Sequence, residues 1–289
     1  MDFRAIGMGV AFALMWSSAF ATARVIVADA PPLWALVARF AVSGAVACGL
    51  ALAMGQSWRL AKGQGRAVVV FGLCQNAAYL GLNFVAMQRV EASVAAIIGS
   101  AMPLNVAMLG WLWRRDRIGG LGLAGLAAGF AGVALIMGVR IQAGADPVGV
   151  GLCICAAVAL AVATLTVRGA SGGGNLLMVV GLQMLVGCAA LIPLATLTEA
   201  LAVRWSPPLV AAFAYQVLVP GVLATVLWFR LVGRIGAVRA STFHFLNPIF
   251  GLGIAALLLG EHIGAMDLIG AAIAMAGILM VQRARARRV

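Results

Sequence analysis

The chain has 289 residues, of which 64% are hydrophobic and only 10% are charged, with a formal net charge of +12. Soluble domains carry about 25% charged residues because their surfaces face water, so this composition excludes a water-soluble globular protein. The positive charge is typical of the cytoplasmic loops of membrane proteins, so we do not expect nucleic acid as a partner.

Ten predominantly apolar stretches follow one another along the chain, each close to the length of about 20 residues that spans a bilayer. We place these predicted helices near Ala5–Ala23, Leu33–Met54, Ala67–Met87, Ala92–Trp113, Leu121–Val139, Val148–Val167, Leu176–Leu197, Leu209–Phe229, Ala237–Leu259 and Leu268–Val281. Short loops with turn residues, such as Pro31-Pro32 and Pro207-Pro208, separate them. The sequence therefore predicts an all-α integral membrane protein with ten transmembrane helices.

The loop charges predict the orientation of these helices. With the N-terminus inside, the inner side carries fourteen basic residues: Arg4, Arg59, Lys62, Arg66, Arg114, Arg115, Arg117, Arg168, Arg230, Arg234, Arg283, Arg285, Arg287 and Arg288. The outer side carries four basic residues and six of the eight acids: Arg24, Arg89, Arg140, Arg204, Asp29, Glu91, Asp146, Glu199, Glu261 and Asp267. Because Lys and Arg concentrate in cytoplasmic loops, both termini are predicted to be cytoplasmic. The loop from Glu261 to Asp267 is expected to be solvated.

The first two predicted helices each contain one residue of interest. Trp16 lies in the middle of the first helix beside two serines, where it would form an aromatic wall for a planar ligand. Arg39 lies within the second helix. Two roles are open for Arg39: it pairs with a backbone carbonyl, or it lines the outer vestibule.

The third predicted helix carries a polar stripe. Its members Gln75, Asn76, Tyr79 and Asn83 follow spacings of three and four, which place them on one side of a helix. Such side chains either line a cavity or join helices together. The length of the stripe favours a cavity.

Pro103 and Pro248 lie near the middle of the fourth and ninth predicted helices. Proline lacks an N–H and clashes with the preceding turn, so each helix should kink or loosen there. These kinks either gate a central site or are structural features repaired by neighbouring Ser or Thr side chains. We favour gating.

The ninth predicted helix also places Ser241, His244 and Asn247 on one face, since they are three apart. Ionisable groups inside a membrane span usually face an interior or a cavity. His244 either binds a substrate carboxylate or carries a proton, or it makes a structural hydrogen bond between helices. In the fifth and tenth helices, Gly125 with Gly129 and Gly270 with Ala274 predict close helix packing.

Internal similarity relates the two halves of the chain. At a shift of 145 positions, residues of the same kind align in order: Pro103 with Pro248, Asp116 with Glu261, Gly125 with Gly270 and Gly132 with Gly277. With a one-residue slip further upstream, Arg39 aligns with Gln183. Each half holds five helices, so the second half must enter the membrane inverted, as in many secondary transporters. We therefore expect a five-helix repeat at 1–144 and a second, inverted repeat at 145–289.

Short motifs distinguish the chain further. The first helix contains Met15-Trp16-Ser17-Ser18-Ala19-Phe20, and the second half contains Ala240-Ser241, Asn247-Pro248, Leu259-Gly260-Glu261, Gly270 and Ala276-Gly277. Over essentially the whole chain, this pattern resembles the ten-helix EamA branch of the drug/metabolite transporter superfamily, and within it the YddG-type exporters of aromatic amino acids. The chain departs from the pattern at Arg115-Asp116, where Gly-Glu is usual, and at Ala161, where tryptophan is common.

The resemblance implies an inner-membrane exporter of amino acids, aromatic ones preferred, that works by alternating access. Its substrate-binding candidates are Trp16, Gln75, Tyr79, Asn83, Ser241, His244 and Asn247, with Pro103 and Pro248 as gating kinks. The expected partners are a small solute and the lipid bilayer, and the expected assembly is a monomer.

Missing motifs narrow the function. The chain has no Gly-rich phosphate loop and no carboxylate at the middle of a span, so we expect no nucleotide hydrolysis, no cofactor, no metal and a weakly charged cavity. Three alternatives stay open: an EamA-type exporter of another metabolite or drug, a membrane-embedded enzyme, and a purely structural membrane subunit, which the polar stripe of the third helix disfavours. An enzyme would need a clustered nucleophile and base, which the sequence does not show.

Overall fold

The computed structural model describes residues 3–61, 63–114, 119–166, 175–235 and 240–286, and the elements in these ranges are all helical. Nine described helices are long and apolar enough to cross a membrane, and a shorter apolar helix covers Phe243–Leu259. Together they correspond to the ten predicted spans, so the all-α, ten-helix fold is confirmed.

The helices are bounded as follows: α1 Phe3–Asp29, α2 Pro32–Ala53, α3 Gln64–Phe71, η1 Gly72–Leu80, α4 Gly81–Ala86, α5 Ala92–Ser100, α6 Met102–Arg114, α7 Gly120–Gln142, α8 Pro147–Thr166, α9 Leu176–Thr198, α10 Pro207–Gln216, η2 Val217–Leu223, α11 Ala224–Ile235, η3 Ser241–Leu246, α13 Asn247–Leu259 and α14 Ala265–Ala286. Pro207, predicted as part of a loop, instead begins α10. Proline is tolerated there because the first N–H groups of a helix have no intrahelical partner. The Ser206 hydroxyl caps this helix by accepting a hydrogen bond from Leu209 N at 3.2 Å.

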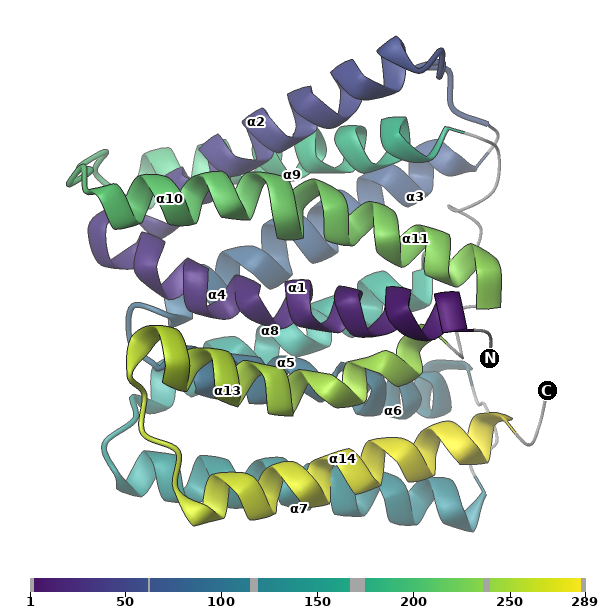
Figure 1. Ribbon diagram of the computed structural model, residues 1–289, viewed down its shortest axis with the longest axis vertical. Helices are drawn as coiled ribbons and strands as arrows, with labels where there is room; N and C mark the ends of the chain where they lie inside the picture. Colours follow the sequence, from purple (N-terminus) through teal and green to yellow (C-terminus); the bar gives the residue numbers. More distant parts are fainter. Residues whose placement is uncertain (1–2, 62, 115–118, 167–174, 236–239, 287–289) are drawn as a thin grey trace.

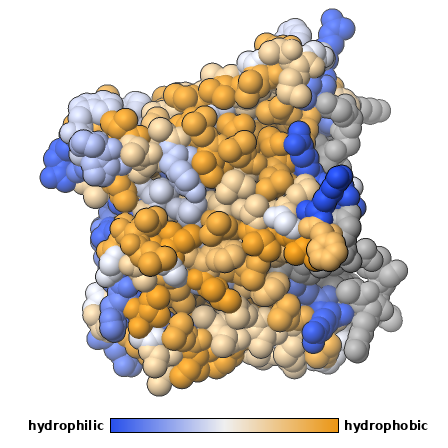
Figure 2. Space-filling model, viewed as in Figure 1, coloured by the Kyte–Doolittle hydropathy of each residue, from blue (hydrophilic) through white to orange (hydrophobic). Residues whose placement is uncertain are grey.

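Two helix pairs form the opposite edges of the bundle, α2 with α9 and α7 with α14, and the other helices lie between them (Figure 1). Both termini lie at one end of the bundle, and we call the opposite end the far end. Hydrophobic residues form a band between two hydrophilic ends (Figure 2). Large apolar side chains of the spanning helices are exposed, for example Leu197 at 83% and Leu257 at 86%. Such exposure is unfavourable in water and natural in lipid.

Four of the central helices are interrupted within their spans. The third and eighth predicted helices each contain a π-helical segment, η1 and η2, which begin at Gly72 and Val217. These two positions are 145 apart, which is the shift of the proposed repeat. The α-helix also breaks at Ala101, just before Pro103, and a 3₁₀ segment, η3, precedes Pro248. The predicted loosening at both prolines is therefore present, while their gating role stays a prediction.

Carboxylates close the far end by capping helices that are distant in sequence. Glu199 accepts hydrogen bonds from the N–H groups of Leu33 and Trp34 at the start of α2, at 3.0–3.2 Å. Glu261 accepts from Ala92 N at 2.8 Å and Ser93 N at 3.0 Å at the start of α5. These are favourable positions for an anion, because the N-terminus of a helix presents free N–H groups and a positive partial charge.

Candidate functional site

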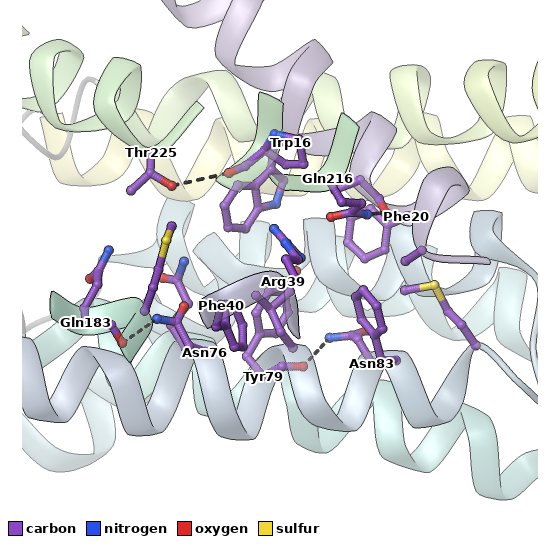
Figure 3. A pocket seen from close by; sticks show the side chains of 18 residues that line it. Trp16, Phe20, Arg39, Phe40, Asn76, Tyr79, Asn83, Gln183, Gln216 and Thr225 are labelled. Atoms are coloured by element: carbon purple, nitrogen blue, oxygen red, sulfur yellow. Dashed lines mark hydrogen bonds between the residues drawn. The ribbon is translucent and has the colours of Figure 1, made fainter. Parts of the chain in front are cut away.

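A cavity lies inside the bundle, between α1, α2, α9 and the interrupted third and eighth predicted helices (Figure 3). Its volume is about 30 Å³, which is room for about one water molecule. Pockets that hold drug-sized ligands span roughly 300–1,000 Å³, so the cavity in this structure is too small for such a ligand. Its polar lining residues are Arg39, Gln75, Asn76, Tyr79, Asn83, Gln183, Gln216 and Thr225.

The π-helical segment η1 presents three of these side chains to the interior. Gln75, Asn76 and Tyr79 are all buried on it. Asn76 Nδ2 donates to the backbone oxygen of Gln183 on α9 at 2.9 Å, and Asn83 Nδ2 donates to the oxygen of Tyr79 at 2.8 Å. The amides thus fix the lining helix against α9 and satisfy carbonyls near the irregular turn. π-Helical segments occur frequently at functional sites.

Aromatic rings form the apolar walls of the cavity. The ring of Trp16 on α1 lies parallel to that of Tyr79, with an interplanar angle of 5° and a centroid separation of 6.3 Å. Phe20 and Phe40 line the same space. This arrangement gives a planar solute surfaces for stacking and apolar contact.

Gln216, at the end of α10, contributes an oriented amide. Its Nε2 donates to the backbone oxygen of Ala19 at 2.6 Å and to Thr22 Oγ1 at 2.8 Å. The side chain belongs to a fully buried residue, and its Oε1 has no hydrogen-bond partner. Because the nitrogen side is held by α1, this oxygen is an acceptor left free for another group.

Arg39 lines the same cavity from α2 (Figure 3). The residue is 4% exposed, and its Nε and Nη1 atoms have no hydrogen-bond partner. Its guanidinium carbon lies 5.6 Å from the centroid of the Phe40 ring. The expectation of a weakly charged cavity is therefore wrong at this position, because a cationic side chain faces the interior. No carboxylate is among the described residues that line the cavity.

The predicted substrate-binding residues separate into two groups. Trp16, Gln75, Tyr79 and Asn83 line the cavity together. His244 and Asn247 do not; Asn247 Nδ2 lies 3.0 Å from His244 Nδ1, and the imidazole packs against Phe12 and Trp228. This hydrogen bond lies within one predicted span and does not join two helices, and a binding or proton-carrying role of His244 stays a prediction. The side chain of Ser241 lies outside the described part of the structure.

The sequence did not single out Gln183, Gln216 and Thr225 as lining residues. Each is an isolated polar residue in an apolar helix, so no stripe marks it. For Gln183 one signal was available, since the proposed repeat aligns it with Arg39.

Known proteins resemble this chain over nearly its whole length. Residues 3–138 and 147–283 each match the EamA-like transporter family. The chain is 24% identical to Protein PecM of Dickeya dadantii over 272 residues, covering 91% of this chain and 86% of that protein. It is also 24% identical to the uncharacterized transporter YvbV of Bacillus subtilis over 269 residues, covering 93% and 88%.

Two further similarities are a match to part of another sequence and a match to a solved structure. A stretch of 69 residues, 24% of this chain and 23% of the relative, is 36% identical to a "Probable amino-acid metabolite efflux pump" of Salmonella typhimurium. A crystal structure superimposes with a TM-score of 0.71 at 20% identity, covering 100% of this chain and 99% of its own. That similarity shows the fold alone.

Proposed function

This chain belongs to the EamA-like transporter family, and we propose that it exports amino acids, aromatic ones in preference, across the cytoplasmic membrane by alternating access. The observation that carries the proposal is the central cavity, where Trp16 and Tyr79 lie parallel beside free or oriented amides. The finer resemblance to the YddG-type exporters, which the motifs suggested, supports the same substrate class.

Transport requires this cavity to change size. At about 30 Å³ it is too small for an amino acid, so a substrate must enter in a conformation in which the lining helices have moved apart. The interruptions at η1, η2, Ala101 and η3 lie in the helices of the bundle interior. Helix breaks of this kind accompany alternating access in transporters built from inverted repeats, which is the arrangement we propose for 1–144 and 145–289.

Two other functions fit less well. Export of a drug-like cation would be favoured by an acidic lining residue, but the described lining carries Arg39 and no carboxylate. A membrane-embedded enzyme would need a cluster of catalytic or metal-binding groups. Among the described residues, no group of three His, Cys, Asp or Glu side chains could hold a metal ion.

The proposal is tested by counterflow in proteoliposomes. Vesicles preloaded with unlabelled tryptophan should accumulate labelled tryptophan, phenylalanine or tyrosine faster than aspartate, glutamate or lysine. Trp16→Ala and Asn83→Ala should each slow this exchange, because each removes part of the lining. Trp205→Ala, at an 81% exposed position, is the control for loss of a tryptophan. Tryptophan exchange no faster than aspartate exchange, in folded wild-type protein, would contradict the aromatic assignment and leave the family assignment intact.

A further inference from the structure

Arg39 is a buried cationic residue whose hydrogen-bond donors are not all satisfied within the protein. Its guanidinium is buried in the interior of a protein that crosses the membrane, and two of its nitrogen atoms have no hydrogen-bond partner. Leaving a buried charge without a partner is costly, and intramembrane arginines normally pair with another group. The ring of Phe40 at 5.6 Å offers a cation–π contact but no hydrogen-bond acceptor in the plane of the guanidinium.

The described part of the chain supplies no counter-charge at the cavity. The acidic residues that the structure describes are Asp29, Glu91, Asp146, Glu199, Glu261 and Asp267, and none of them lines the cavity. They lie at or next to helix ends at the far end of the bundle. An anionic partner for Arg39 at this site would therefore come from the solute.

The same cavity also contains a hydrogen-bond acceptor that has no donor. Gln216 Oε1 is buried without a donor, while its amide nitrogen is engaged by Ala19 and Thr22. The cavity thus offers free donors on Arg39 and a free acceptor on Gln216, next to the Trp16 ring (Figure 3). A carboxylate and an ammonium group on one small molecule complement this pair.

We infer that Arg39 binds the carboxylate of the transported solute and that Gln216 accepts a hydrogen bond from its ammonium group. The inference rests on the proposed function and narrows its substrate class to solutes that carry a carboxylate. Guanidinium and carboxylate form paired, charge-assisted hydrogen bonds, which would fix one end of the solute while its side chain contacts the aromatic walls. A structural role for Arg39, with a water molecule filling the small cavity, is the competing explanation.

Competition experiments separate the functional groups of the solute. In tryptophan counterflow, indole-3-propionate keeps the ring and carboxylate, whereas tryptamine keeps the ring and ammonium. We expect indole-3-propionate to compete and tryptamine to compete about tenfold more weakly than tryptophan, since hydrogen bonds to charged groups are the strong ones. Tryptamine competing as well as tryptophan would overturn the inference while leaving the proposed function standing.

Variants of Arg39 separate binding from structure. Arg39→Gln should reduce tryptophan exchange by about tenfold or more. Arg39→Lys keeps the charge but loses the two-pronged geometry, so we expect a partial loss. Arg230→Gln makes the same change at an exposed position on α11 and should exchange tryptophan normally. Wild-type exchange by Arg39→Gln would overturn the inference.

Melting temperature in detergent gives a readout that is independent of transport. Removing an unpartnered buried charge should not destabilise the protein, so Arg39→Gln should melt at or above the wild-type temperature. Arg39 would be a structural residue if Arg39→Gln melted at a clearly lower temperature than the wild type and tryptamine competed equally well in both proteins. The melting temperature still tests the inference if no amino acid exchanges at all. Aromatic carboxylates should then raise the melting temperature of the wild type, whereas the corresponding amides should not, and neither should raise that of Arg39→Gln. Equal effects of acids and amides would refute the inference.

Discussion

Arg140 is the centre of a charged cluster at the far end. Its Nε and Nη2 bind both carboxylate oxygens of Asp267 at 3.0 and 2.8 Å, and Nη2 also donates to the backbone oxygen of His262 at 3.1 Å. Nη1 pairs with Glu91. The side chains of Arg140 and Asp267 are only 12% and 6% exposed. The expectation that Asp267 lies in a solvated loop is therefore wrong, because its side chain is buried between the ends of α7 and α14.

The Arg140–Asp267 pair is predicted to stabilise the fold. Asp267→Asn should lower stability by about 1–3 kcal/mol, less than the ~3–5 kcal/mol for a fully uncompensated buried charge, because Glu91 still faces Arg140. Thermal unfolding in detergent would measure this. Asp29→Asn is the control, since its ion-pair partner Arg204 is 79% exposed and such pairs contribute little, while the Asn oxygen can still accept the hydrogen bond from Ser206 Oγ. Equal melting temperatures for both variants would contradict a stabilising role for the buried pair.

Sequence reasoning at the residue scale succeeded where polar residues formed a pattern. Gln75, Tyr79 and Asn83 follow helical spacing, and all line the cavity. Gln216 stands alone in an apolar helix, and only the fold brings it beside α1. The role of His244 was open in the sequence because the spacing that pairs it with Asn247 is the same for a site and for a local hydrogen bond.

At the scale of helices, glycines set the closest contacts in the bundle. A Cβ on Gly125 would lie 2.8 Å from the backbone oxygen of Gly277, and one on Gly132 would lie 2.6 Å from that of Gly270. The predicted close packing of the fifth and tenth helices is thus confirmed for α7 and α14. Gly44 and Gly181 play the same part between α2 and α9, where a Cβ on Gly181 would meet Gly44 O at 2.9 Å. Small residues allow this approach, which gives dispersion contact that lipid cannot provide.

Gly277→Val should disrupt the α7–α14 pair. Its Cβ would collide with the backbone of Gly129, so the helices must separate at a cost of about 1–3 kcal/mol or more. Gly138→Val is the control on α7, since nothing lies within 4 Å of a Cβ there. The expected result is a lower melting temperature for Gly277→Val alone. Loss of stability in both variants would point to helix propensity instead of packing.

The sequence predicted the existence of the helices better than their ends and interruptions. Hydropathy marked all ten spans because each must cover the same bilayer thickness. The first helix nevertheless continues to Asp29, beyond the predicted end at Ala23. The segments η1 and η2 carry no composition that distinguishes them from α-helix, apart from Pro220 within η2. Only the prolines gave a local signal for an interruption.

For the whole molecule, side-chain contacts between residues distant in sequence hold the far end of the bundle together. Glu199 and Glu261 reach from loops of the second half to the first turns of α2 and α5 in the first half. Arg89 pairs with Asp146 at 2.9 Å between the third and sixth spans. This hydrogen bond from Arg89 lowers the pKa of Asp146, and bonds from Val148 N and Gly149 N act in the same direction. In the alternating access that we propose, opening toward the far end would separate these contacts.

The last prediction concerns the orientation of the bundle. The connection between α2 and α3 lies at the end with both termini, whereas the connection between α7 and α8 lies at the far end (Figure 1). Ser57 and Ala143 are exposed positions on these two connections. Because most loop Lys and Arg residues fall on the side of the termini, Ser57 should face the cytoplasm and Ala143 the outside.

Single cysteines test this orientation after replacement of the native Cys48, Cys74, Cys153, Cys155 and Cys188. A membrane-impermeant maleimide applied to intact cells should label Ala143→Cys and leave Ser57→Cys unlabelled. Inverted vesicles should give the opposite result, and detergent-solubilised protein should label at both positions as the control. Labelling of Ser57→Cys from outside would reverse the orientation. The far-end carboxylate caps would then face the cytoplasm, and an exporter would have to separate them to admit its solute instead of to release it.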